Sequence, residues 1–317
     1  MLTFDPSVFN PDHHPADAKA VNAAIVKRLA SWDNWAQSPA EIRDLRRRGE
    51  GPFPPTPFSP RAETVTIEGK HGPIALRIFT PKEPRGAYLH IHGGGWVLGA
   101  ADLQDTMLEQ LSERTGLAVV SVDYRLAPEA PYPMGPDDCE TAALWLAAEA
   151  LGRFGTDKLT IGGESAGAHL SVVTLLRLRD RHGIMPFVGA NLHAGCYDLS
   201  LTPSVRRWGA EKLVLNTRDI ENFVRHFLVR GGSTDDPDVS PIHADLTGMP
   251  PALFTVGSRD PLVDDSLFMA PRWAAAGNKT ELEVYPGGCH VFIGFPGSNT
   301  TRCNARIEDF LRGVCAA

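Results

Sequence analysis

The 317-residue sequence lacks several features that would assign it to a class at once. It has no apolar run long enough to cross a bilayer, so we expect no membrane span. It has no excess of basic residues: the formal net charge is -7, and this mild acidity argues against a nucleic-acid partner. Residues 1–14 are polar and contain proline, which is not the pattern of a secretory signal.

Cysteine is scarce as well, and no internal repeat or low-complexity tract is seen. The five cysteines are an odd number and lack the spacing of a metal-binding motif. They are Cys139, Cys196, Cys289, Cys303 and Cys315. We interpret them as mostly reduced thiols, which predicts a cytoplasmic protein without a disulfide framework.

The composition is that of an ordinary globular protein, 43% hydrophobic and 22% charged, and α/β folds often reach this length as one unit. Short β-prone runs alternate with helical patterns. The predicted strands cover residues 64–68, 74–80, 87–91, 117–122, 158–161, 188–193, 252–256 and 281–285. The predicted helices cover residues 103–114, 136–150, 166–178, 266–276 and 301–314. This alternation predicts an α/β fold with a mostly parallel sheet flanked by helices, and the opening hairpin predicts an antiparallel edge.

Two stretches do not fit this alternation. Amphipathic helices are predicted over residues 17–36 and 39–48, and a proline-dense connector follows over residues 51–57. The second stretch lies between the sixth and seventh predicted strands and predicts one or two helices. The first is interpreted as a cap over a site, with a plain surface helix pair as the alternative, and the second is interpreted as a further cap segment. The predicted organisation is a single domain over residues 1–317 with cap segments at about 1–55 and 198–235.

One motif organises the rest of the chain. Gly163, Ser165 and Gly167 form a G-x-S-x-G pattern between the β-prone residues 158–161 and the apolar, helix-prone residues 166–178. Strand, tight turn and buried helix are the context in which this pattern becomes a nucleophile elbow, with the serine hydroxyl exposed and small residues where strand and helix nearly touch. A plain glycine-rich turn is the alternative, because the bare pattern also arises by chance.

The sequence H-G-G-G-W at residues 92–96 follows directly on the predicted strand 87–91. Such a loop would serve acyl transfer, in which negative charge develops on the former carbonyl oxygen and backbone N–H groups stabilise it. His92 is expected to anchor the loop, and a flexible glycine turn is the alternative. The predicted oxyanion hole consists of two N–H groups from the loop of Gly93, Gly94 and Gly95, together with that of Ala166, and all four residues are candidates.

If Ser165 is a nucleophile, an acid and a base must follow it in the chain in that order. Asp260 lies just past the predicted strand 252–256, and His290 lies just past the predicted strand 281–285. Parallel strands bring their carboxyl ends to one edge of a sheet, so these side chains are expected in the same layer as Ser165. The spacing therefore predicts a Ser–His–Asp triad.

Other acids and histidines fit these roles less well. Asp264 and Asp265 compete with Asp260, but they are expected to begin the following helix. His169 lies in the helix after the serine and His193 ends a strand without a serine motif, so both are expected to be core residues. A capping aspartate at Asp260 and a loop histidine at position 290 remain the alternatives.

Five stretches together form a specific combination: H-G-G-G-W at 92–96, D-Y-R-L-A-P-E at 123–129, G-E-S-A-G at 163–167, Asp260-Pro-Leu, and His290. They resemble the hormone-sensitive lipase family of α/β-hydrolases, in its bacterial carboxylesterase branch, from about residue 62 to the end. The resemblance implies the helical cap, and it implies structural supports near the site at Asp123, Arg125 and Glu129. The sequence departs from the family at the two neighbours of the histidine, which are Cys289 and Val291.

The resemblance implies a serine carboxylesterase that hydrolyses small esters with short acyl chains through an acyl-enzyme, with Ser165, Asp260 and His290 as catalytic residues. It implies neither a metal nor an organic cofactor. An amide or formamide hydrolase on the same triad is the nearer alternative, and a non-catalytic small-ligand receptor on the same fold is a further one. Family members often pair through the last strand, so a homodimer is compatible with the resemblance. From position alone, the hypothesised pocket residues are Trp96, Trp208 and Phe292.

Overall fold

An eight-stranded sheet forms the centre of the molecule in the computed structural model, which describes residues 5–54 and 57–317. Its spatial order is β1-β2-β4-β3-β5-β6-β7-β8. The strands are β1 (Glu63–Ile67), β2 (Ile74–Phe79), β3 (Gly86–Ile91), β4 (Leu117–Asp123), β5 (Leu159–Glu164), β6 (Phe187–His193), β7 (Ala252–Arg259) and β8 (Thr280–Cys289). The pairs β1–β2 and β2–β4 are antiparallel and the other pairs are parallel. The predicted α/β fold with an antiparallel edge is confirmed.

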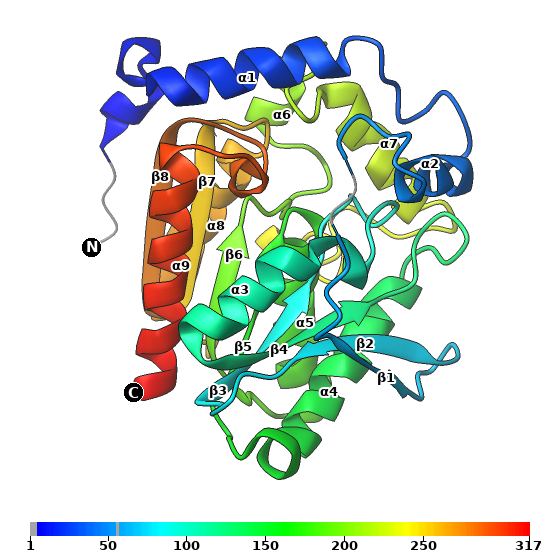
Figure 1. Ribbon diagram of the computed structural model, residues 1–317, viewed down its shortest axis with the longest axis vertical. Coiled ribbons are helices and arrows are strands. Elements are labelled where there is room, and N and C mark those ends of the chain that lie inside the picture. The colour runs from blue at the N-terminus through cyan, green and yellow to red at the C-terminus, as the bar shows by residue number, and fades with distance from the viewer. Residues whose placement is uncertain (1–4, 55–56) are drawn as a thin grey trace.

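Helices cover both faces of this sheet (Figure 1). On one face lie α3 (Asp105–Thr115) and α9 (Ser298–Ala316); on the other lie α4 (Met134–Phe154), α5 (Ala166–His182) and α8 (Val263–Ala275). Every residue of β3 and β5 is buried, since neither face of these central strands meets water. The carboxyl ends of these central strands are therefore supported by a buried core.

Four more helices lie together at one end of the sheet, beyond the carboxyl ends of the parallel strands (Figure 1). They are α1 (Ala16–Leu29), α2 (Pro39–Arg47), α6 (Pro203–Trp208) and α7 (Thr217–Phe227). They come from the two stretches predicted as cap segments. Residues 1–4 and 55 of the predicted segment 1–55, and residues 55–56 of the predicted connector, lie outside the described residues.

Two element boundaries differ from the sequence prediction. The helix predicted over residues 17–36 ends at Leu29, because Asp33 accepts the N–H of Trp35 with its carboxylate, and such local turns compete with helix. The strand predicted to end at Tyr285 continues to Cys289 through Pro286. Proline is tolerated there because β8 is the edge strand and one of its sides needs no ladder hydrogen bonds.

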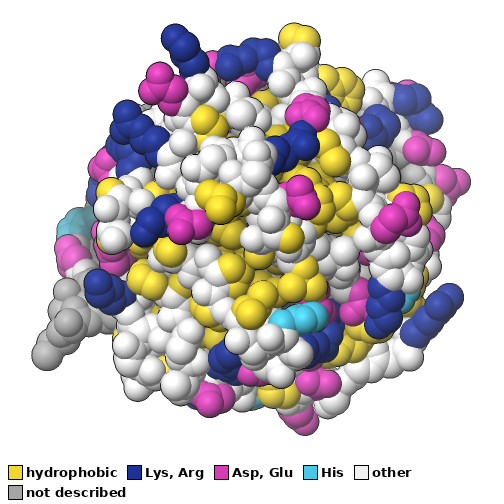
Figure 2. All heavy atoms as spheres, turned by 90° about the horizontal axis from the view of Figure 1, so that it is seen from below, with side chains coloured by type: hydrophobic (Ala, Val, Ile, Leu, Met, Phe, Trp, Pro, Cys, Tyr) yellow, Lys and Arg dark blue, Asp and Glu magenta, His cyan; other side chains and the backbone are white. Residues whose placement is uncertain are grey.

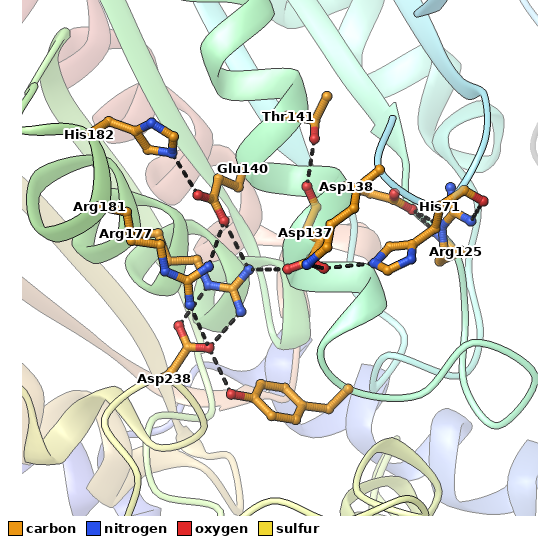
Figure 3. A network of polar contacts seen from close by, with 12 residues as sticks. His71, Arg125, Asp137, Asp138, Glu140, Thr141, Arg177, Arg181, His182 and Asp238 are labelled. Atoms are coloured by element: carbon orange, nitrogen blue, oxygen red, sulfur yellow. Dashed lines mark hydrogen bonds and ion pairs between the residues drawn. The ribbon is translucent and has the colours of Figure 1, made fainter. Parts of the chain in front are cut away.

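A buried group of ions joins α4, α5 and the segment after α7, and we name it the Arg177 cluster (Figure 3). The guanidinium of Arg177, 2% exposed, donates to Asp137 at 2.9 Å, Glu140 at 3.1 Å and Asp238 at 2.7 Å. The hydroxyl of Tyr132 donates to Asp238 at 2.7 Å. Burial lowers the pKa of Arg177, but the hydrogen bond and charge of Asp238 more than offset this, so the pKa is raised overall. The cluster therefore anchors one end of the second predicted cap segment to the core.

The surface gives no sign of a single-charge field on the face shown in Figure 2, where basic and acidic side chains are interspersed around hydrophobic ones. Within residues 5–54 and 57–317, no helix is both long and apolar enough to cross a membrane. Over the same ranges, no group of three or more His, Cys, Asp or Glu side chains is arranged to hold a metal ion.

Candidate active site

Ser165 occupies a strained turn between β5 and α5, with φ 56° and ψ -121°. The turn is possible because glycines flank it. A Cβ atom on Gly163 would lie 1.9 Å from the carbonyl oxygen of Ile91, and one on Gly167 would lie 1.8 Å from the same atom. A non-glycine residue at positive φ persists only where its surroundings impose it, and such strain gathers at functional sites. The geometry is that of a nucleophile elbow.

The three predicted catalytic side chains lie together at the carboxyl edge of the sheet. His290 Nε2 is 3.0 Å from Ser165 Oγ, and His290 Nδ1 is 2.9 Å from Asp260 Oδ2. Asp260 Oδ1 also accepts the N–H of Leu262 at 2.8 Å, which fixes the carboxylate. All three are buried, with Ser165 the most exposed at 8%. This is the hydrogen-bonded line that a serine hydrolase uses to activate its hydroxyl.

The rival carboxylates serve other purposes. Asp265 accepts N–H groups of Tyr197 and Asp198 and the hydroxyl of Thr202, and burial raises its pKa to about 7. Asp264 accepts the N–H of Ser204 at 2.7 Å. Both lie in the first turn of α8, as expected, and both fasten α8 to the segment after β6.

The rival histidines are fully buried in the core. His169 accepts the indole N–H of Trp96 at Nδ1 (3.1 Å), and its Nε2 lies 2.8 Å from the carbonyl oxygen of Val239. His193 Nδ1 lies 2.7 Å from Thr255 Oγ1. Burial lowers the pKa of His169 to about 4 and that of His193 to about 3, so both stay neutral near pH 7.

The loop at residues 92–96 leaves two of its glycine N–H groups available. The N–H of Gly93 donates to Glu164 Oε1 at 2.5 Å, so including Gly93 among the oxyanion donors was wrong. Among the described residues, the N–H groups of Gly94, Gly95 and Ala166 have no hydrogen-bond acceptor. Three preorganised donors beside Ser165 can stabilise an oxyanion.

Side chains from several elements hold this loop in place, and of these His92 and Tyr124 are buried. His92 stacks on Tyr124, whose hydroxyl donates to the carbonyl oxygen of His92 at 3.0 Å, and burial lowers the pKa of His92 to about 4. Asp123 accepts the N–H of Ala101 at 3.0 Å. Glu129 pairs with Arg43 at 2.7 Å, and Arg43 also donates to the carbonyl oxygen of Val97. Arg125 lies farther away and fastens Asp138 and the β1–β2 turn.

A cavity of about 320 Å³ opens above Ser165, within the size range of small-ligand sites. The glycine loop, Ser165 and His290 form its floor. Leu29, Phe53 and Phe223 contribute apolar walls from the segments predicted as caps. A Cβ atom on Gly95 would lie 2.3 Å from the Phe223 ring, so α7 packs directly on the oxyanion loop. Beyond this floor, the polar side chains among the described lining residues are Asn34, Arg46, Gln104, Glu164 and Cys196.

Of the three hypothesised pocket residues, one lines the cavity and two do not. Trp96 lines the cavity, but it is 3% exposed and stacks on Phe227. Trp208 and Phe292 are not among the lining residues, so those assignments were wrong. The Trp208 indole donates to the carbonyl oxygen of Glu211 within its own loop, and Phe292 packs against His193 behind the catalytic histidine.

Sequence reasoning also missed functional neighbours of the triad. Glu164 directly precedes the nucleophile, and its carboxylate accepts from Gly93 and from the Gln104 side chain at 2.9 Å. Its place inside the G-E-S-A-G motif was a signal that could have found it. Arg46 and Phe223 carry no such signal, because nothing in a helical pattern tells which residue reaches a cavity.

Known proteins share this arrangement. The family model described as alpha/beta hydrolase fold matches residues 88–294. An acetyl esterase of Salmonella schwarzengrund is 29% identical over 234 residues, which cover 73% of this chain and 72% of that protein. A hyperthermophilic esterase from the archaeon Pyrobaculum calidifontis has a TM-score of 0.83 at 27% identity, covering 96% of this chain and 99% of that one. A hormone-sensitive lipase from a metagenome library, at 24% identity and a TM-score of 0.82, shares the fold and covers 95% of this chain and 99% of that one. The resemblance stated from the sequence is confirmed, and the chain belongs to the α/β-hydrolase fold family.

Proposed function

We propose that this protein is a serine carboxylesterase that hydrolyses small esters with short acyl chains through an acyl-enzyme. The observation that carries the proposal is the line from Ser165 through His290 to Asp260, with contacts of 3.0 and 2.9 Å, at the floor of a mostly apolar cavity. The relatives named acetyl esterase and esterase support the same chemistry.

Acylation begins when His290 Nε2 takes the proton of Ser165 as the hydroxyl oxygen attacks the ester carbonyl carbon. Asp260 accepts the Nδ1–H and so selects the tautomer whose Nε2 is free to act as a base. The N–H groups of Gly94, Gly95 and Ala166 stabilise the oxyanion, each contributing about 3 kcal/mol. His290 then protonates the leaving alcohol.

Deacylation repeats these steps with water. His290 takes a proton from water, hydroxide adds to the acyl carbon, and the same N–H groups stabilise the second tetrahedral intermediate. His290 returns the proton to Ser165, and the carboxylic acid leaves. The residues named supply all of the proton transfers.

The experiment measures kcat/KM on p-nitrophenyl esters of increasing acyl length and, in parallel, on formyl-anilides. We expect the short acyl esters to be hydrolysed fastest. Ser165→Ala is expected to abolish both turnover and labelling by an organophosphate while the melting temperature stays near that of the wild type. Labelling that persists in Ser165→Ala would place the nucleophile elsewhere, and faster turnover of formyl-anilides would favour the formamide hydrolase.

Three further predictions from the sequence belong with this proposal. The segments 1–55 and 198–235 are proposed to act as a cap, supported by the walls that Leu29, Phe53 and Phe223 give the cavity. A cytoplasmic location and a homodimer formed through β8 stay predictions. Light scattering of the purified protein measures the latter directly.

A further inference from the structure

Arg46 brings a positive charge into a cavity whose walls are otherwise mostly apolar. It lies in the last turn of α2, and its side chain lines the same cavity as Ser165 and His290. Its stem packs on Gly51, where a Cβ atom would lie 3.0 Å from Arg46 Cγ. The guanidinium therefore cannot swing freely into solvent on that side.

Arg46 has no carboxylate partner in the described part of the chain. Its guanidinium donates to Asn34 Oδ1 at 2.8 Å, an oxygen that also accepts the indole N–H of Trp32 at 2.7 Å. Its Nε is buried without any hydrogen-bond partner. The arginines around it differ, since each has an ion pair: Arg43 with Glu129, Arg47 with Asp102, and Arg48 with Glu50.

The charges nearby do not neutralise Arg46. Burial lowers the pKa of Arg46, and the charge of Asp219 offsets this only in part. Asp219 already accepts the indole N–H of Trp35 at 2.8 Å and lies 3.8 Å from Lys212. Glu164 is the only acidic side chain among the described residues that line the cavity, and it is engaged by Gly93 and Gln104. One positive charge is left uncompensated.

The helix that carries Arg46 is held firmly. A capping box joins Ser38 and Glu41 at its start, Ile42 is 1% exposed, and Arg43 donates to the carbonyl oxygen of Val97 beside the glycine loop. A charge on a fixed element loses little entropy when it binds a ligand. The position is therefore suited to recognition, because a desolvated guanidinium with free donors binds a carboxylate strongly and often through two bonds.

We propose that Arg46 is a specificity-determining residue that binds a carboxylate of the substrate. The preferred substrates are then hemiesters of dicarboxylic acids, in which a free carboxylate lies remote from the scissile ester bond. This inference rests on the proposed esterase function. Neutral esters of the same length fill the apolar part of the cavity but leave the guanidinium unpaired. The carboxylate stays ionised through the reaction and takes part in no bond change.

The test compares monoethyl succinate, glutarate and adipate with ethyl butyrate, valerate and hexanoate, followed by acid release at constant pH. In Arg46→Gln the ratio of kcat/KM for the best hemiester to that for its neutral match is expected to fall about 10- to 100-fold, as for the loss of a charged hydrogen bond. Arg46→Lys is expected to keep part of the ratio, because it keeps the charge but not the planar fork. Arg47→Gln, one residue along and paired with Asp102, is the matched control and is expected to keep the whole ratio.

A second measurement needs no variant. Adipate is expected to inhibit neutral-ester hydrolysis competitively at least about 10-fold more strongly than adipamide, its uncharged analogue. Equal inhibition by the two, or an unchanged ratio in Arg46→Gln, would overturn the inference while the esterase proposal stands. A wild-type protein that hydrolyses neither set of esters would instead overturn the esterase proposal.

Discussion

The catalytic triad and the Arg177 cluster are both buried groups of charged and polar side chains brought together from distant parts of the chain, yet they differ in what surrounds them. The guanidinium of Arg177 meets three carboxylates, and these also pair at the rim with His71, Arg181 and His182 (Figure 3). Lys70 pairs with Asp137 as well. The triad has one free end instead, because Ser165 Oγ faces the cavity. A cluster in which every charge is paired stabilises the fold. A group with a side free toward a cavity, such as the Ser165 hydroxyl, is available for reaction.

The first way to break this comparison is Asp260→Asn. The amide cannot hold His290 in the reactive tautomer, so kcat is expected to fall about 10⁴-fold. The free energy of unfolding is expected to change little, since the side chain keeps its shape. Asp264→Asn in the first turn of α8 is the control and is expected to keep kcat. Comparable rates in Asp260→Asn and wild type would mean that another acid orients His290.

Arg177→Met is expected to have the opposite effect, lowering stability and leaving kcat unchanged. It leaves Asp137, Glu140 and Asp238 facing one another, and breaking a buried ion pair typically costs 3–5 kcal/mol, so about that loss is expected in the free energy of unfolding. The kcat of the folded fraction is expected to stay close to the wild-type value. Urea unfolding and initial rates measure the two quantities.

Arg181→Met is the matched control for that change. Arg181 contacts Glu140 and Asp238 as Arg177 does, but its side chain is 45% exposed. Exposed ion pairs contribute about 0–1 kcal/mol, so a loss in that range is expected. Equal losses in the two variants would show that burial does not set the strength of this cluster.

The pH dependence of stability extends the comparison to buried histidines that have no charged partner. Burial lowers the pKa of His92 and His169 to about 4 and that of His193 to about 3, whereas histidine in an unfolded chain titrates near 6.5. The unfolded state therefore binds more protons between these values, and stability is fully present above about pH 6.5 and falls as pH drops toward 4. These shifts correspond to at most about 3 kcal/mol each for His92 and His169 and about 5 kcal/mol for His193.

Urea unfolding across this window measures the effect. In His169→Gln one of the three contributions is missing, so the dependence of stability on pH is expected to be shallower than in the wild type. The carboxylates of Asp137 and Asp238 have lowered pKa values in the Arg177 cluster, so their contribution is lost only at lower pH. Stability that is constant from neutral pH to pH 5 would contradict the buried neutral histidines.

The triad residues could be predicted from the sequence because the topology of a parallel sheet determines where they lie. Each of Ser165, Asp260 and His290 follows a parallel strand, and the carboxyl ends of such strands meet at one edge. The element types could be predicted for the same reason, since hydrophobic periodicity reports which faces are buried. Boundaries such as Leu29 and Cys289 depend on local side-chain hydrogen bonds and on an edge position, which periodicity does not record.

Contacts that depend on side-chain direction could not be predicted. The sequence does not tell that Glu164 would take the N–H of Gly93, or that Trp208 would bond to its own loop rather than reach the cavity. The Arg177 cluster draws on α4, α5 and the segment after α7, and the chain offers 31 basic and 38 acidic residues to choose from. Only the packed structure selects the partners.

The carbonyl oxygen of Ile91 sits against both glycines of the elbow, and the glycine loop starts at the very next residue. The positions of the nucleophile and of the oxyanion loop are thus coupled through close packing around the carbonyl oxygen of Ile91. Evolution or engineering that seeks new selectivity has little freedom in that floor, where even a methyl group does not fit. Changes in selectivity are therefore expected in the cap segments. Relatives that prefer different substrates should differ in the residues above Ser165 and share the glycines of the elbow and of the loop.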